Sequence, residues 1–216
     1  FYKEDAVAGR KMYEFVGGDL QARKLNGVVT MAKVTDPSEK ELVARFGIGR
    51  APMPMTVAVA PNGAVTGLFP REVQGANIDA AIVPPTMMRC MKQLQDQKLV
   101  FVCLTKSDRA VVPAGVKELQ TDPDFKDRVT LVSMRATDPS ETRFLDQMKV
   151  NPEQVSGAYA VLIAPPGVLI GHYDGTASKD DIAAAIHKAG QCCDDVNCKH
   201  NRPAAPQAKR PTTGRN

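Results

Sequence analysis

A repeated pentapeptide is the feature that most constrains the fold of this chain. The sequence Thr-Asp-Pro-Ser-Glu occurs at residues 35–39 and again at residues 137–141. Each copy follows an apolar run that is typical of a buried strand, at 28–34 in the first case and at 129–134 in the second. Because self-similarity of this kind normally reflects one structural unit used more than once, the repeat predicts two units that fold alike.

The similarity extends beyond the pentapeptide. Behind each copy, apolar residues recur at helical spacing, in 42–46 and in 144–148. Each unit then continues with a strand, a turn that contains glycine and a second strand, at 56–69 and at 160–173. A final helix is predicted in both units, at 77–82 and 181–186. A strand–helix–strand pair followed by an antiparallel hairpin and a helix predicts the α/β class, with a mixed sheet and helices on both faces.

The segment from Asp36 to Ile82 resembles the second half of a thioredoxin domain. It has a polar turn, a helix that ends near Gly47, a proline-led strand, the pair Asn62-Gly63 and a last helix. In that family a cis-proline precedes the hairpin strand, and counting back from Asn62-Gly63 places it at Pro54, next to Met53. The same count in the second unit reaches Ala158, so the second unit departs from the family there.

The resemblance implies two tandem thioredoxin-like domains, each a mixed sheet flanked by helices. We place the first unit at residues 1–85 and the second at residues 86–198. The remaining residues, 199–216, form a basic tail that contains prolines and lacks apolar periodicity. We expect this tail to be disordered or to lie extended on a partner.

The redox motif of the family is missing from both units. Thioredoxins carry Cys-x-x-Cys at the start of the helix after the first strand, where the helix N-terminus lowers the pKa of a thiol. The corresponding stretches are Lys3–Val7 and Lys106–Val112, and neither contains a cysteine. The sequence therefore argues against disulfide exchange at these positions. It also has no motif for a phosphate or a dinucleotide cofactor, and we expect no cofactor.

The first unit also lacks its opening strand. The run Leu99–Leu104 is the first strand of the second unit, and Phe1 aligns with the end of that run, near Leu104. The strand is central in a thioredoxin-like sheet, so its loss would leave backbone groups unpaired. We expect that the polypeptide continues before Phe1, that another chain supplies the strand, or that the unit is a reduced variant. The first explanation is the simplest.

The candidate chemical residues are concentrated near the C-terminus. They are Cys192, Cys193, Cys198 and His200. The simplest interpretation is a local disulfide that closes onto Cys198 and holds the end of the last helix. Free or partner-linked thiols are the next alternative, and a metal site or a haem attachment site is the third. The other cysteines, Cys90 and Cys103, lie in a predicted helix and a predicted strand, at positions typical of the core.

Composition limits the class of protein and its partners. Hydrophobic residues make up 43% and charged residues 24% of the chain, which is a globular balance, and no apolar run has the length of a membrane span. The basic residues of the tail are Lys199, Arg202, Lys209, Arg210 and Arg215. They suit an acidic protein surface or lipid headgroups rather than specific nucleic-acid binding. A C-terminal disulfide would favour an exported or periplasmic location over a cytoplasmic one.

These features predict a non-catalytic interaction or scaffold protein that is a subunit of a larger complex. The surface around Met53, Pro54 and Met55 is the predicted binding face. One alternative is a thiol-disulfide oxidoreductase that uses the C-terminal cysteines, or cysteines before Phe1. The other is a metal or haem carrier that uses the same C-terminal cluster.

Overall fold

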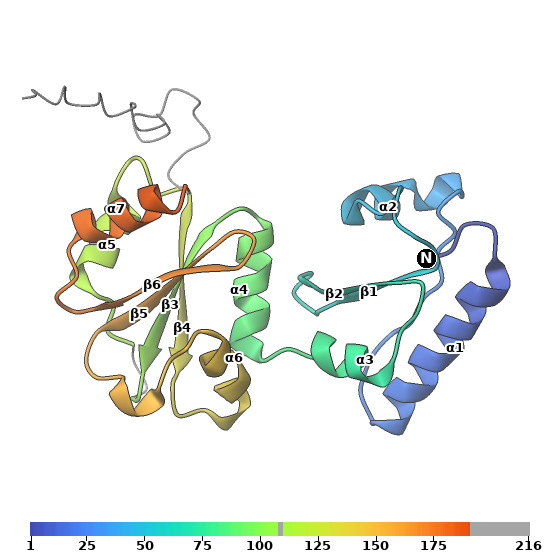
Figure 1. The fold of residues 1–216 in the computed structure, drawn as a ribbon, viewed down its shortest axis with the longest axis horizontal. Helices are drawn as coiled ribbons and strands as arrows, with labels where there is room; N and C mark the ends of the chain where they lie inside the picture. The colour runs from blue at the N-terminus through green and yellow to red at the C-terminus, as the bar shows by residue number, and fades with distance from the viewer. Residues whose placement is uncertain (108–109, 191–216) are drawn as a thin grey trace, which may run out of the picture.

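The computed structural model describes residues 1–107 and 110–190. Within these residues the chain is a mixed α/β protein with two sheets and seven α-helices (Figure 1). No helix in the described part is both long enough and apolar enough to span a membrane.

The larger sheet has four strands in the order β4-β3-β5-β6. These are β3 (Leu99–Thr105), β4 (Val129–Arg135), β5 (Tyr159–Ala164) and β6 (Val168–Asp174). Strand β3 runs parallel to β4 and antiparallel to β5, and β5 and β6 form an antiparallel hairpin. Every residue of β3 is buried, as expected for a central strand with helices on both faces. The predicted mixed sheet is therefore present in the second half of the chain.

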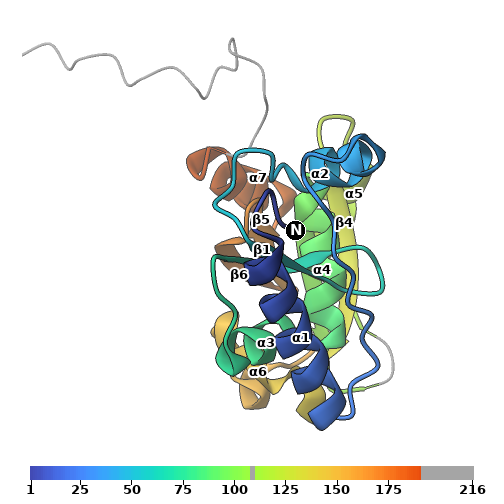
Figure 2. The same ribbon diagram turned by 90° about the vertical axis from the view of Figure 1, so that its right-hand side faces the viewer.

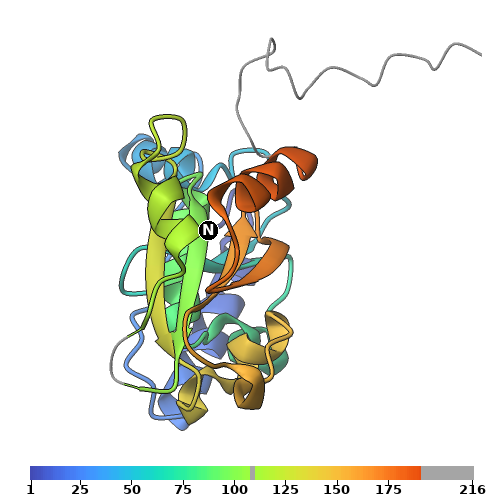
Figure 3. The same ribbon diagram turned by 90° about the vertical axis from the view of Figure 1, so that its left-hand side faces the viewer.

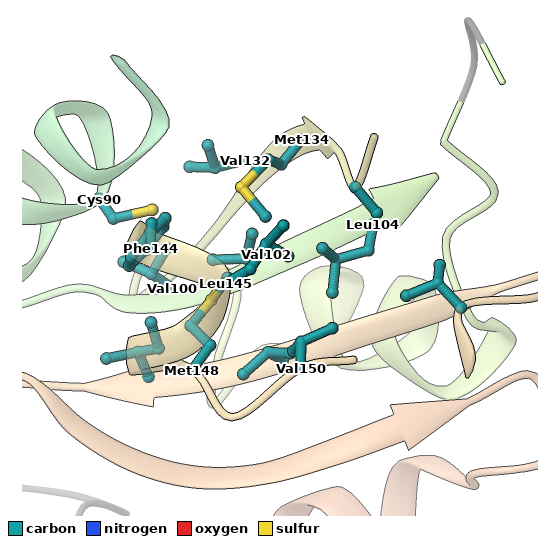
Figure 4. Close-up of a cluster of buried hydrophobic side chains, with 14 of the residues drawn as sticks. Cys90, Val100, Val102, Leu104, Val132, Met134, Phe144, Leu145, Met148 and Val150 are labelled. Atoms are coloured by element: carbon teal, nitrogen blue, oxygen red, sulfur yellow. The ribbon is translucent and has the colours of Figure 1, made fainter. Parts of the chain in front are cut away.

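Alternate residues of β3 serve the two faces of this sheet. Val100, Val102 and Leu104 pack against α4 (Pro85–Gln95) and α6 (Thr142–Gln147) in one apolar cluster, part of which is drawn in Figure 4. Phe101 and Cys103 pack on the other face, against α5 (Ala114–Thr121) and α7 (Lys179–Lys188). Figure 3 shows α5 and α7 side by side over that face. A short 3₁₀ helix, η3 (Pro152–Gln154), leads into β5.

The first half of the chain has a sheet of two strands, β1 (Met55–Val59) and β2 (Val65–Pro70). Three helices accompany it: α1 (Ala6–Ala22), α2 (Lys40–Phe46) and α3 (Gly75–Ala81). The prediction of a regular strand at 28–34 is wrong, because this segment forms only a single bridge, between Lys33 and Tyr2. A strand is defined by its partner, and most of this segment has none beside it in the described residues.

The repeated pentapeptides form the same local structure. Each Pro-Ser-Glu is a 3₁₀ helix, η1 (Pro37–Glu39) or η2 (Pro139–Glu141). In each, the Oδ1 atom of the preceding aspartate accepts hydrogen bonds from the serine two residues later, at 2.9 Å from its backbone N–H and at 2.7 Å from its hydroxyl. The serine hydroxyl is also the largest cause of the lowered pKa of Asp36 and of Asp138. The repeat is thus a helix-initiating cap used twice.

The two hairpins also match in a detail that the sequence does not reveal. Both antiparallel pairs have an irregular register near the end of their first strand, between Ala58 and Val59 in one and between Leu162 and Ile163 in the other. These positions correspond in the alignment of the two halves. The structural similarity of the halves therefore extends to the register of the hairpins.

Helix α4 joins the two halves and lies between the β1–β2 hairpin and the four-stranded sheet (Figure 1). The Oε1 atom of Gln95 accepts from the N–H of Val65 at 2.9 Å, and its Nε2 donates to the carbonyl of Val65 at 2.7 Å. The amide of Gln95 thus pairs with β2 as a neighbouring strand would. Asn62 adds a bond from its Nδ2 to the carbonyl of Met88, at 3.0 Å.

Candidate functional site

A large apolar hollow lies in the first half of the chain. It is a cavity of about 670 Å³ between α1, residues 25–32 and β1. Its walls are mostly apolar and include Met12, Val16, Leu42, Phe46, Val57 and Ile78. We call the part of this cavity between residues 28–32 and β1 the strand slot, for the reason that follows.

The backbone of Phe1 and Tyr2 forms one end of the strand slot. The amino group of Phe1 donates to the carbonyl of Met55 at 2.9 Å, and the N–H of Met55 donates to the carbonyl of Phe1 at the same distance. On the other side, Tyr2 donates to Ala32 at 3.0 Å and accepts from Val34 at 2.8 Å. Phe1 and Tyr2 therefore link the segment at 32–34 to β1, as one strand of a three-stranded arrangement.

The end of β3 makes the equivalent contacts in the second half. Leu104 lies opposite Tyr159, as Phe1 lies opposite Met55. The N–H of Ala136 donates to the carbonyl of Thr105 at 2.8 Å, the same distance as from Val34 to Tyr2. From Leu104, β3 continues between β4 and β5 back to Leu99. At the corresponding place beyond Phe1 lies the strand slot.

Side chains beside the strand slot are more exposed than the equivalent side chains beside β3. Val59 of β1 is 43% exposed, whereas Ile163, at the equivalent position in β5, is 7% exposed. Val28, on the other side of the strand slot, is 92% exposed. Valines of this kind gain stability from burial, at about 25 cal/mol per Å² of apolar surface, so the slot leaves favourable burial unused.

The helix starts that would carry the redox motif hold no sulfur. At the N-terminus of α1 the Oδ1 atom of Asp5 accepts from the N–H groups of Val7 and Ala8, both at 3.0 Å. A carboxylate thus occupies the position where a thiolate would be stabilised. Helix α5 begins at Ala114 after Pro113, again without a cysteine.

The two cysteines of the described residues are buried and are not accessible for thiol chemistry. Cys90 and Cys103 are fully buried, and they belong to the apolar clusters on opposite faces of the sheet. Figure 4 shows Cys90 beside Phe144 and Val100. Burial raises the pKa of Cys90 to about 12 and that of Cys103 to about 11. Neither thiol forms a thiolate near neutral pH, so neither attacks a disulfide.

The predicted binding face around Pro54 is only partly at the surface. The Met53–Pro54 peptide bond is cis, Met53 and Pro54 are half-buried, and Met55 is buried in the sheet. The second half also has a cis bond, but it is at Pro165–Pro166 in the turn between β5 and β6.

The predicted chemical cluster lies outside the described residues. This applies to Cys192, Cys193, Cys198 and His200, and to the basic tail. In the part of the chain that the structure describes, no group of three or more His, Cys, Asp or Glu side chains is arranged to hold a metal ion.

One polar pair was missed because it spans two strands. The hydroxyl of Tyr159 and the Nδ1 of His172 are 2.8 Å apart, on neighbouring strands β5 and β6. Burial is the larger cause, and the charge of Asp174 the smaller cause, of the raised pKa of Tyr159. In sequence His172 looks isolated. The hairpin register, once assigned, would have placed it on the same face as Tyr159.

Comparison with protein-family models, with curated proteins and with solved structures found no match.

Proposed function

We propose that this chain is a non-catalytic interaction or scaffold protein made of two thioredoxin-like units, and that it acts as a subunit of a larger complex. The observation that carries the proposal is the combination of buried, unreactive cysteines in the described residues with exposed apolar side chains on α1. When a thioredoxin-like fold has no reactive group at the start of these helices, its surfaces are the part that can bind other molecules.

The architecture supports the thioredoxin-like part of the proposal. In the second half, a parallel strand pair is followed by an antiparallel hairpin, with helices on both faces of a mixed sheet. This is the arrangement that the resemblance implies. The first half has the same helix caps and the same hairpin register as the second half. The cis bond of the first half precedes Pro54, at the family's proline position.

Helix α1 supports the interaction part. Val7 and Phe15 are 67% and 45% exposed, and with Lys11 they follow one another along one stripe of the helix at four-residue spacing. Figure 2 shows α1 in front of the rest of the molecule, on the side away from the four-stranded sheet. Exposed aliphatic and aromatic side chains that share one face of a helix, with a charged side chain between them, favour a protein-binding surface.

A thiol assay tests the non-catalytic part. We expect that neither the wild-type chain nor a Cys192→Ser/Cys193→Ser/Cys198→Ser variant accelerates the reduction of insulin by dithiothreitol. In the variant, a thiol reagent at pH 8 should find no reactive group until urea unfolds the protein, because the remaining thiols are buried and protonated. Insulin reduction by the wild type that disappears in the variant would establish the oxidoreductase alternative instead.

Isolation of the tagged chain from its native source tests the scaffold part. We expect a defined complex of constant stoichiometry with the wild type, and its loss in Phe15→Glu. Glu14→Ala, on the same helix turn, is the matched control and should retain the complex. All three proteins should unfold at similar temperatures, because both side chains are exposed. A monomeric wild-type protein would refute this part of the proposal.

A further inference from the structure

We propose that the strand slot is filled in the complete molecule by an extended strand joined to the backbone nitrogen of Phe1, parallel to residues 28–32 and antiparallel to β1. The first sheet would then have the same four-strand order as the second. This inference concerns the fold of the first half and does not depend on the proposed function.

The second half supplies the register of the added strand. Since Leu104 lies opposite Tyr159, the residues before it in β3 lie opposite β5 as far as Val100 and Ile163. The same register places the residue before Phe1 opposite Thr56, and the earlier residues opposite Val57, Ala58 and Val59. A segment of about five residues in β conformation reaches the far end of β1, at about 3.3 Å per residue.

The walls of the slot determine the chemistry of the strand. Figure 1 shows α2 on one side of the β1–β2 hairpin, and α1 and α3 on the other. Leu42 and Phe46 line the cavity from α2, and Met12 and Val16 line it from α1. Both faces of the added strand would meet apolar side chains, so we expect an uninterrupted run of aliphatic or aromatic residues, as in β3.

The position of the Phe1 nitrogen identifies a joined strand rather than a separate one. The nitrogen already donates to the carbonyl of Met55, which occupies the position that Tyr159 holds opposite Leu104. Burial lowers the pKa of this amino group, because an ammonium loses solvation there. A peptide bond at this nitrogen keeps the hydrogen bond to Met55 and removes the charge. A strand from another chain would have to end against the ammonium and would leave it buried.

Amide hydrogen exchange on extended forms of the full chain tests the proposal. The test variant carries Leu-Val-Phe-Val-Ala before Phe1, copied from β3 with alanine in place of Cys103. The matched control carries Leu-Val-Pro-Val-Ala, whose proline cannot donate to the ladder and disturbs the strand. The third sample is the unextended chain with the free peptide Leu-Val-Phe-Val-Ala in excess.

We expect the joined apolar strand to slow exchange at the amides of Ala32 and Val57 by roughly tenfold or more, since both would gain a hydrogen-bonded partner. The proline control should exchange at the rate of the unextended chain. If the free peptide gives the protection and the joined strand does not, the slot accepts a strand from another chain. If neither gives protection, the slot is not a strand site. Either result overturns the proposal.

Discussion

Replacing Gly115 by alanine should destabilise the protein, although alanine is the better helix former. Gly115 lies in the first turn of α5, against the segment that leads into α7. A Cβ at this position would lie 2.5 Å from the carbonyl oxygen of Ala177, 2.6 Å from the carbonyl carbon of Ser178 and 2.7 Å from the nitrogen of Lys179. All three are backbone atoms, so no side-chain rotation relieves the contact.

The two opposing effects have different magnitudes. Helix propensity favours alanine over glycine by about 1 kcal/mol in a helix interior, and by less in a first turn. Overpacking of a tight interface costs about 1–3 kcal/mol, with the larger values where the backbone has to move. We therefore expect Gly115→Ala to lower the free energy of unfolding by about 2 kcal/mol. In a unit of about 100 residues this corresponds to a fall in Tm of roughly 10 °C.

Urea unfolding followed by circular dichroism measures this change, and Gly18→Ala in α1 is the control. A Cβ at Gly18 has nothing within 4 Å, so only propensity acts and we expect a gain of about 0.5–1 kcal/mol. The reasoning is refuted if Gly115→Ala is as stable as the wild type while Gly18→Ala shows its gain. That outcome would mean that α5 and α7 separate without loss of packing.

Two further predictions concern polar contacts of the second half. Glu141→Ala should lower the free energy of unfolding in urea by about 2 kcal/mol, because the buried N–H of Thr86 loses its acceptor at 2.8 Å. Glu141→Gln keeps an acceptor and should lower it by less than about 1 kcal/mol. Equal losses in the two variants would contradict this explanation. The hydrogen bond from Lys179 is the largest cause of the lowered pKa of Asp122. This pair therefore stabilises the protein fully at pH values above the ordinary carboxylate pKa of about 4. The stabilisation disappears as the pH falls through the lower pKa of Asp122 in the folded protein. The same bond raises the pKa of Lys179, so the alkaline limit lies above its ordinary value of about 10.4. The difference in urea midpoint between the wild type and Asp122→Asn should be constant from about pH 5 to pH 9 and should vanish in acid, and a difference that persists at pH 2 would refute the ion pair as its source.

The second half could be predicted from sequence because its signals are local and mutually consistent. The apolar run Leu99–Leu104 became the central strand β3, buried throughout. The predicted helix that carries Cys90 became α4. The spacing of apolar residues shows which face of a helix or strand is buried, so these segments formed the elements that their spacing predicts.

The first half shows where such signals fail. The residues at 28–34 have strong β propensity, but propensity is realised only when a neighbouring strand accepts the backbone hydrogen bonds. The sequence predicts a strand before Phe1 through the alignment of Phe1 with Leu104. It gave no indication that Gln95 would pair with Val65, because a single polar contact between distant elements leaves no periodic trace.

The repeated pentapeptide separates what local sequence determines from what tertiary structure determines. Both copies form the same 3₁₀ helix with the same aspartate–serine hydrogen bonds. Their glutamates nevertheless differ: Glu141 is buried and accepts from the N–H of Thr86 at the start of α4, whereas Glu39 is only half-buried. Helix α4 packs beside η2 and immediately precedes β3 in the chain. The burial of Glu141 therefore arises from the helix that leads into the central strand, and a sequence identical over five residues acquires two environments from its neighbours.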